Sequence, residues 1–577
     1  MRALMWAIWR KIRQLSSTEL LSLISWLGAL AVLRYRIPYG VNHRDEAFYS
    51  AMPYSFLIGN QPYIDERTVH QNAGLLLLPL YRLYLSLAGS SDGIILFNRY
   101  LYLVYIGFTS FLAYRLVRRI VNFSAACWAG ALLVSFGYFN LLALSYNSMG
   151  ALGFMCGVLL TAHALLEASP GRGLFVANLF FLTAVFCYPG LVVAFLPYNL
   201  SVVAWLYWKT PRATLKSGFW GLGAAVAAAL LVFVPFGFWL AGERYERLHS
   251  LQLGQGYGTL SGLAKLDFYH SYAWAWRPAL LAFSAVFVLV PLACYWLRRG
   301  VWLIAPVSAL LCIACYRVGF GLGAVTPAMF FFMAIPVLAP VCVALNRDWP
   351  HGRFLLVLVW APSVLSMLAV TYTSSNDWLA TLLGALGAVV SGIAALGALL
   401  DARALRNPAA RVGYQLALLG FAGACLGIEV DSLFSYFYDQ SGVTFSSLDT
   451  RVKAGPMRGT IGTSSDAALC ETIHRDLKSF EASAGSLTIF DAFPLGYLST
   501  KLRSRTWTQW IIWGIPAAQR TRLMRETFGD PGQLPDLVLK INMEPASKAL
   551  WPKYERGHYR KVLERKEFGY AIYMKTR

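Results

Sequence analysis

Two acidic pairs near the N-terminus, Asp45-Glu46 and Asp65-Glu66, have the residue types that most directly suggest chemistry. The first pair stands among aromatic residues and close to arginines. A carboxylate held ionised in such surroundings can be aimed at a hydroxyl group, which is what a general base requires. The helix dipole would also favour these acids at a solvated helix N-terminus. The second pair precedes Arg67, so a turn or an ion pair explains it as well as substrate binding does.

Composition indicates the elements that must position these acids. The chain has 577 residues, of which 57% are hydrophobic and only 14% charged, against roughly 25% charged in soluble domains. A soluble core cannot bury that much apolar surface, so lipid must surround much of the chain. The net charge of +21 is expected for a membrane protein with basic cytoplasmic loops, and no nucleic acid partner is needed. Most of the nine cysteines lie in apolar runs and are predicted to be buried hydrophobic residues.

Apolar runs long enough to cross a bilayer predict a polytopic α-helical membrane protein with about 13 transmembrane helices over about residues 1–430. Basic residues close to the N-terminus place it in the cytoplasm, and every predicted inner loop then holds a cation. An odd number of helices puts the chain from about residue 431 onward on the outer, periplasmic side. We expect a bacterial inner-membrane protein.

Two predicted outer loops, about 35–93 and 241–277, are long enough to be functional. The first contains both acidic pairs and an amphipathic stretch around Leu75–Leu87. The second carries cations on the side where the positive-inside bias disfavours them, which suggests a ligand. Snorkelling to the membrane interface explains any single one of these cations better than a ligand does, but we expect at least one of the set to bind phosphate.

The remaining residues, 431–577, are polar and predict a small soluble α/β domain of ordinary size. The predicted strands are Ser486–Phe490, Asp536–Ile541 and Tyr570–Met574, and the predicted helices lie near Ala467–Phe480 and Ala517–Thr527.

The first helix, the outer loop that opens with Asp45-Glu46, and the later Gly59, Pro62 and Tyr63 together resemble the GT-C membrane glycosyltransferases. The nearest groups are the lipid A aminoarabinose transferases and the protein O-mannosyltransferases. The resemblance covers topology over about 430 residues and sequence detail only over about 42–85. About 13 predicted helices followed by an outer C-terminal domain resemble the layout of the aminoarabinose transferases more than the shorter layout of the mannosyltransferases.

The resemblance implies a sugar donor linked through phosphate to a polyprenyl lipid, with transfer at the outer face and inversion at the anomeric carbon. Asp45 matches the family's first-loop carboxylate, which activates or orients the acceptor hydroxyl, and Glu46 stands beside it as a second catalytic candidate. A phosphate leaving group needs its charge neutralised rather than a strong acid. Arginine is suited to this because it binds phosphate through paired hydrogen bonds.

On this basis the remaining candidates fall into two groups. Those expected at the donor phosphate are Arg244, Arg247, Lys265, Arg277, Arg317 and His70. Those expected at other parts of the substrates are Tyr49, Asp65, His249 and His270. His70 lies where the aminoarabinose transferases usually have Lys-Pro-Pro, so the identity of the sugar does not carry over. The next outer loop, around Leu144–Met149, holds no acid, and we expect neither a metal nor another cofactor.

The leading hypothesis is therefore an inverting glycosyltransferase that moves a sugar from a polyprenyl-phosphate donor to an envelope glycan, lipid or protein. A transporter or lipid flippase would explain the helices but not the large outer loops and outer domain. A glycan ligase or polymerase using lipid-diphosphate donors would rely on outer-loop arginine and histidine instead of Asp45. A noncatalytic assembly subunit is a further alternative.

Overall fold

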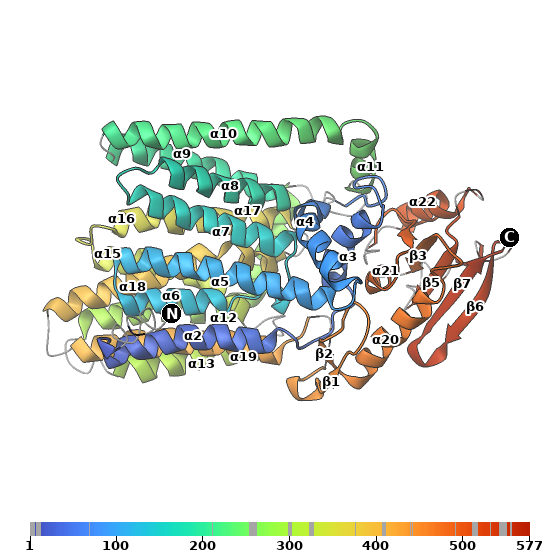
Figure 1. The fold of residues 1–577 in the computed structure, drawn as a ribbon. Helices are drawn as coiled ribbons and strands as arrows, with labels where there is room; N and C mark the ends of the chain where they lie inside the picture. The colour runs from blue at the N-terminus through green and yellow to red at the C-terminus, as the bar shows by residue number, and fades with distance from the viewer. Residues whose placement is uncertain are drawn as a thin grey trace.

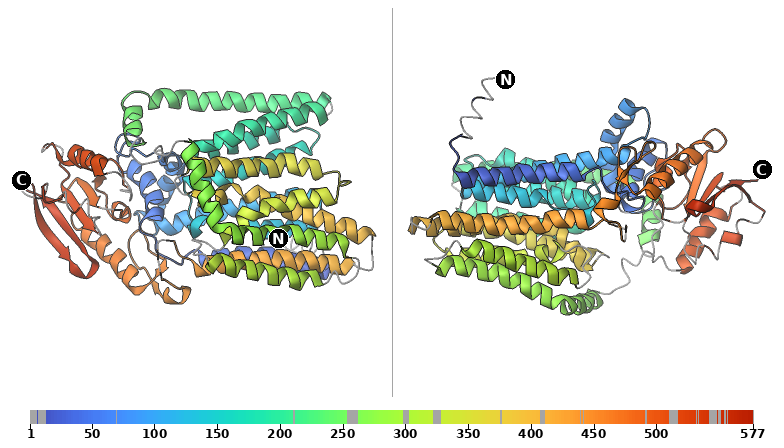
Figure 2. Two further views of the ribbon diagram at one scale, coloured as in Figure 1. Left: turned by 180° about the vertical axis from the view of Figure 1, so that it is seen from behind. Right: turned by 90° about the horizontal axis from the view of Figure 1, so that it is seen from below.

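The computed structural model consists of a bundle of long helices with a smaller α/β domain packed against one end (Figure 1). Two further views show the domain at that same end, which is called the domain end below; the opposite one is the far end (Figure 2). The structure describes residue 6 and residues 13–576 except 69, 210–211, 253–261, 298–302, 322–327, 375–376, 407–410, 439, 441, 491, 510–516, 531, 533, 542–547, 549–550, 554 and 556.

Nine helices in the described part of the chain are long and apolar enough to cross a membrane, and four shorter apolar helices accompany them. A helix lies at every predicted spanning position, which confirms the expected polytopic membrane fold. The bundle helices are α2 (Ser17–Arg36), α5 (Ile94–Ile120), α6 (Phe123–Val134), α7 (Tyr146–Leu165), α8 (Gly171–Cys187), α9 (Val192–Lys209), α10 (Arg212–Leu240), α12 (Gly262–Trp296), α13 (Ile304–Gly321), α14 (Ala328–Ala334), α15 (Leu338–Leu345), α16 (Gly352–Leu355), α17 (Ala361–Thr373), α18 (Leu386–Arg406) and α19 (Arg411–Ser435).

The first predicted outer loop folds into two helices, α3 (Asp45–Leu57) and α4 (Gln71–Ala88), which lie between the bundle and the α/β domain (Figure 1). Helix α4 contains the amphipathic stretch noted in the sequence. The second predicted loop holds α11 (Glu243–Gln252) and then runs into α12, which begins well before the apolar stretch and includes Pro278. The loop is therefore shorter than expected, because its polar and aromatic residues are also compatible with a helix.

The C-terminal domain is built on a five-stranded sheet in the order β4-β3-β5-β7-β6. Strands β4, β3 and β5 are parallel, whereas β7 runs antiparallel to both β5 and β6. The predicted strands and helices are all present, and the structure adds short elements that the sequence pattern did not reveal. The elements are β1 (Thr450–Arg451), β2 (Ile461–Gly462), α20 (Ser464–Lys478), β3 (Ser486–Phe490), α21 (Leu495–Leu498), β4 (Arg503–Ser504), α22 (Ala517–Phe528), β5 (Leu537–Ile541), β6 (Tyr559–Arg565) and β7 (Tyr570–Lys575).

Backbone pairing joins the first outer loop to the C-terminal domain. The Gly40 N–H donates to the Ile461 carbonyl at 2.8 Å, and the Arg67 N–H donates to the Trp507 carbonyl at 3.0 Å. Buried apolar residues of the domain and of the bundle also belong to one continuous core. All nine cysteines are free and buried, as predicted for those in the apolar runs, and Cys470 of the C-terminal domain is buried as well.

Candidate functional site

The first acidic pair forms the N-terminus of α3 at the domain end of the bundle. The Asn42 side-chain oxygen accepts hydrogen bonds from the backbone N–H groups of Arg44, at 3.1 Å, and Glu46, at 3.2 Å, and so caps the start of this helix. Asp45 is the first helical residue and is half-buried. The positive end of the helix dipole therefore lies at a carboxylate that still reaches the surface of the protein.

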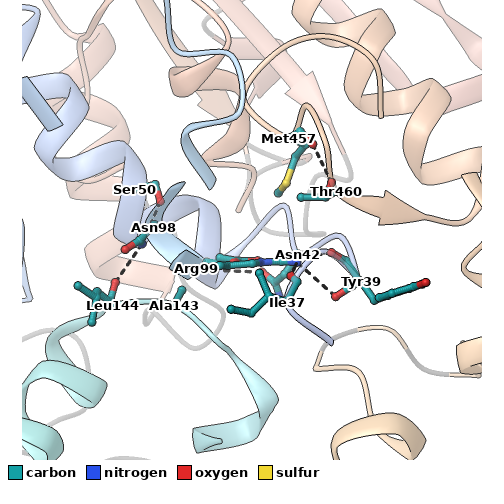
Figure 3. A network of polar contacts seen from close by, with 12 residues as sticks. Ile37, Tyr39, Asn42, Ser50, Asn98, Arg99, Ala143, Leu144, Met457 and Thr460 are labelled. Atoms are coloured by element: carbon teal, nitrogen blue, oxygen red, sulfur yellow. Dashed lines mark hydrogen bonds and ion pairs between the residues drawn. The ribbon is translucent and has the colours of Figure 1, made fainter. Parts of the chain in front are cut away.

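Glu46 is buried and forms a two-pronged ion pair with Arg99 of α5. The Arg99 Nε and Nη2 atoms lie 2.5 Å and 2.6 Å from the two Glu46 carboxylate oxygens. Arg99 also donates to the backbone carbonyls of Ile37, at 2.7 Å, and Gly40, at 2.8 Å. Figure 3 shows Arg99 lying between α5 and the segment that links α2 to α3. The ion pair thus fixes the segment that carries Asp45 against the bundle.

Arg36, the last residue of α2, brings a second buried guanidinium to the same place. Its Nε donates to the Leu433 carbonyl at 2.6 Å, and its guanidinium carbon lies 4.3 Å from the centre of the Phe437 ring. Arg36, Arg99 and Glu46 line a small cavity of about 20 Å³, enough for about one water molecule, together with polar groups of Asn42 and other residues. Two cations and one anion in its wall give the buried start of α3 one net positive charge.

A group of four rings centres on Tyr146 and includes Tyr49 of α3. Tyr49 meets Tyr146 edge-on with ring centres 5.8 Å apart. His70 stacks on Tyr146 at 4.0 Å, and Tyr188 lies parallel to Tyr146 at 6.0 Å. Burial lowers the pKa of His70 to about 4, so its imidazole ring is neutral at pH 7. A neutral His70 can donate a hydrogen bond to a phosphate but cannot neutralise its charge.

The predicted phosphate-binding cations of the second outer loop are spread over several elements. Arg244 lies over the Trp239 ring, with its guanidinium carbon 4.7 Å from the ring centre. Arg247 pairs with Glu243 at 2.6 Å and donates to a carbonyl of the first outer loop. Three more candidates are exposed and lie on different helices: Arg277 on α12, Arg317 on α13, and His249 on α11. The side chains of Lys265 and His270 lie outside the described residues.

Asp65 and Arg247 do come together, in a cleft between the first outer loop, α11 and the C-terminal domain. This cleft has a volume of about 590 Å³. Asp65 closes a turn by accepting a hydrogen bond from the Gln61 N–H at 2.7 Å. Arg67 instead pairs with Glu526 of the C-terminal domain at 2.8 Å. The predicted residues therefore divide between the buried start of α3 and this wider cleft.

Arg99 and Asn98 were not predicted from the sequence, although both are buried near the start of α3. The Asn98 amide donates to the Ser50 hydroxyl at 3.2 Å and to the Leu144 carbonyl at 3.1 Å (Figure 3). An arginine inside an otherwise apolar membrane helix is a signal that could have revealed Arg99. In the described part of the chain, no three His, Cys, Asp or Glu side chains gather closely enough to hold a metal ion.

Comparison with known proteins gives structural matches only. The sequence matches no family model and no curated protein. Among solved structures, the chain is similar to ArnT from Cupriavidus metallidurans in the apo state, with 12% identity, coverage of 99% of this chain and 98% of that one, and a TM-score of 0.48. It is also similar to the oligosaccharyltransferase AglB from Archaeoglobus fulgidus in complex with an inhibitory peptide and a dolichol-phosphate. That match has 12% identity, coverage of 96% and 74%, and a TM-score of 0.49.

ArnT bound to undecaprenyl phosphate matches over 96% of both chains at 12% identity and a TM-score of 0.38. ArnT and AglB are GT-C glycosyltransferases, the class that the sequence itself resembles. With identities this low and TM-scores below 0.5, the function has to be argued from the chain's own residues.

Proposed function

We propose that this protein is an inverting glycosyltransferase that moves a sugar from a polyprenyl-phosphate donor to an acceptor hydroxyl of an envelope glycan, lipid or protein. The observation that carries the proposal is the division within the first acidic pair. Glu46 is buried and held by Arg99, whereas Asp45 stands half-buried at the N-terminus of α3. Only Asp45 is then placed to meet a substrate, and Glu46 serves to hold it.

In this proposal the Asp45 carboxylate accepts the proton of the acceptor hydroxyl as the oxygen attacks the anomeric carbon. The bond from that carbon to the phosphate oxygen breaks on the opposite face, so the anomeric configuration inverts. The leaving group is polyprenyl phosphate, and its charge needs neutralisation rather than protonation.

The net positive charge of Arg36, Arg99 and Glu46 supports binding of that phosphate beside the start of α3, because their wall has one more cation than anions. Arg244 and Arg247 remain proposed contacts for the more exposed part of the donor. The rings of Tyr49, His70, Tyr146 and Tyr188 are proposed to pack against the sugar or the prenyl chain.

We place the domain end of the bundle in the periplasm. The loops and helix ends at the far end contain Arg118, Arg119, Arg347, Arg403 and Arg406, which fits the positive-inside rule for a cytoplasmic face. Asp45 and the C-terminal domain would then both lie on the outer side, where a lipid-linked sugar is presented.

The test is Asp45→Asn in purified protein supplied with a polyprenyl-phosphate sugar, with release of polyprenyl phosphate as the readout. Loss of the general base should lower the rate by about 10²- to 10⁴-fold. Asp449→Asn is the matched control, because Asp449 is exposed in the C-terminal domain and has a nearby hydroxyl as its partner. A well-folded Asp45→Asn protein that transfers sugar at the wild-type rate would refute the proposal.

A further inference from the structure

The cleft between the first outer loop, α11 and the C-terminal domain has a volume of about 590 Å³, which is within the usual range of about 300–1000 Å³ for a small-ligand pocket. Its ionisable lining consists of Arg67, Arg247, Arg503, Arg505, Asp65, Glu526 and Asp536. Which of these charges are already matched by protein partners decides what the cleft can bind.

The acids of the cleft wall are satisfied by the protein itself. Asp65 accepts the Gln61 N–H, and Glu526 pairs with Arg67. Asp536 accepts hydrogen bonds from the Ser486 N–H and the Ser486 hydroxyl, both at 3.0 Å. These carboxylates therefore have little capacity left for a cationic ligand.

Two of the arginines are in the opposite situation. Arg503 and Arg505 are exposed, and their guanidinium groups form no ion pair with any described residue. They flank Ser504 at and just beyond the end of the edge strand β4, and alternate residues of an extended strand face the same side, about 6.6 Å apart along it. This spacing suits two oxyanions on one extended ligand.

The surrounding structure holds this pair in place. Ser504 is buried and bound through its backbone to the Asn60 side chain, at 2.8 Å and 3.2 Å. The Arg503 guanidinium lies against Gly59, where a Cβ atom would come within 2.8 Å of it. Gly59 also has a φ of 108°, which suits a residue without a side chain. The Arg67 Nε is buried in the same wall without a hydrogen-bond acceptor among the described residues.

We propose that this cleft binds an anionic saccharide, with phosphate or carboxylate groups seated on Arg503 and Arg505. The inference rests on the proposed function in one respect, namely that the bound saccharide is the acceptor. The cleft is shared by the C-terminal domain and the loop just beyond α3, and Asp45 stands at the other end of that helix, so an acceptor that reaches both spans the length of α3, about 20 Å. The domain thereby selects acceptors by charge, which gives this part of the protein a role in specificity.

The experiment measures binding of soluble phosphorylated dextran and of unmodified dextran to the full-length protein in detergent. The wild type should bind the phosphorylated form more tightly. The double variant Arg503→Gln/Arg505→Gln should weaken that binding by about tenfold or more, because it removes two charge-assisted contacts. The control is Arg560→Gln/Lys561→Gln, which removes the same charge from exposed positions on β6, at the opposite edge of the sheet.

Equal binding of the two dextrans, full affinity in the Arg503/Arg505 variant, or an equal loss in the control would overturn the proposal. Phosphatidylcholine vesicles with a phosphorylated disaccharide glycolipid distinguish the source of the ligand. If they compete with phosphorylated dextran, the acceptor is membrane-borne; if they do not, it is a soluble glycan. Asp45→Asn should bind like the wild type, so a failed transfer reaction leaves the binding result interpretable.

Discussion

The two acidic pairs of the first outer loop have the same sequence and the same pattern of burial, yet their glutamates are stabilised in different ways. Glu46 and Glu66 are both about 1% exposed. Glu46 faces the guanidinium of Arg99, a residue of the membrane bundle. Glu66 accepts hydrogen bonds from neutral backbone groups, the N–H of Gln509 at 2.8 Å and that of Thr68 at 3.2 Å.

This difference separates the two pairs by function. A buried carboxylate paired with an arginine can hold a neighbouring catalytic group in place. A buried carboxylate held by one backbone N–H of the C-terminal domain and one of its own loop instead joins that domain to the loop. The dipeptide alone therefore does not identify a catalytic site, because the partner that folding supplies decides what each acid can do.

The largest loss of stability is expected from Arg99→Met, which removes the ion-pair partner of Glu46 in the first acidic pair. The variant leaves the buried Glu46 charge unmatched and the carbonyls of Ile37 and Gly40 without their donor. Removing one partner of a buried ion pair costs about 3–5 kcal/mol. Thermal unfolding in detergent should show a large fall in the midpoint.

Arg119→Met provides the control, because Arg119 is partly exposed at the far end and its carboxylate partner, Glu167, is 3.6 Å away. That variant should cost less than about 1 kcal/mol. A small effect of Arg99→Met, comparable with that of the control, would mean that Glu46 does not depend on its arginine.

The next largest loss of stability is expected at Asn60, which lies close to the second acidic pair and joins the first outer loop to the C-terminal domain. Asn60→Ala removes two hydrogen bonds to the Ser504 backbone and leaves those groups buried without partners. We expect a loss of about 1–3 kcal/mol in the free energy of unfolding. Asn346→Ala, which loses a single 3.3 Å bond to Ala398 at the far end, should cost less. Equal losses would show that the loop is not fixed through Asn60.

Glu66 should also make stability depend on pH in a way that no exposed acid does. Burial raises the pKa of Glu66 above its usual 4.5, so the folded state binds this proton more tightly than the unfolded chain does. The stabilisation that the protonated Glu66 contributes is complete at low pH. It is lost as the pH rises from about 4.5 through the raised pKa of Glu66.

Unfolding measured from pH 4 to pH 8 should therefore show a downward component in the wild type that Glu66→Gln lacks. One proton accounts for at most about 1.4 kcal/mol per pH unit. Glu567→Gln, an exposed residue of the C-terminal domain, should keep the wild-type profile. Parallel profiles for the wild type and Glu66→Gln would contradict the raised pKa.

Periodicity and apolar length were sufficient to predict most of the fold. The predicted spanning helices and the strands at Ser486–Phe490 and Tyr570–Met574 follow from long apolar runs or short β-rich runs, which depend only on local sequence. Strand β4 was missed because two residues, Arg503 and Ser504, provide no periodic pattern. It forms because β3 offers a parallel partner, a long-range contact.

The candidate site was only partly predictable, for the same reason. Asp45 could be found from its place after the first helix, because that order is visible in the chain. The partner of Glu46 could not, since Arg99 lies 53 positions away and meets it only through the packing of α3 against α5. The cleft at Arg503 and Arg505 likewise depends on how the C-terminal domain packs against the first outer loop.

The smallest expected effect distinguishes Asp65 from Asp45. Asp65 accepts one hydrogen bond, from the Gln61 N–H, and closes a local turn. Asp65→Ala should therefore cost about 0.5–1.5 kcal/mol, the value of one such bond. Asp65→Asn keeps an acceptor oxygen in the same place and should unfold within about 0.5 kcal/mol of the wild type. If Asp65→Asn is instead as destabilising as Asp65→Ala, the charge of this acid matters as well as its oxygen. The second pair would then resemble the first more closely than its hydrogen bonds indicate.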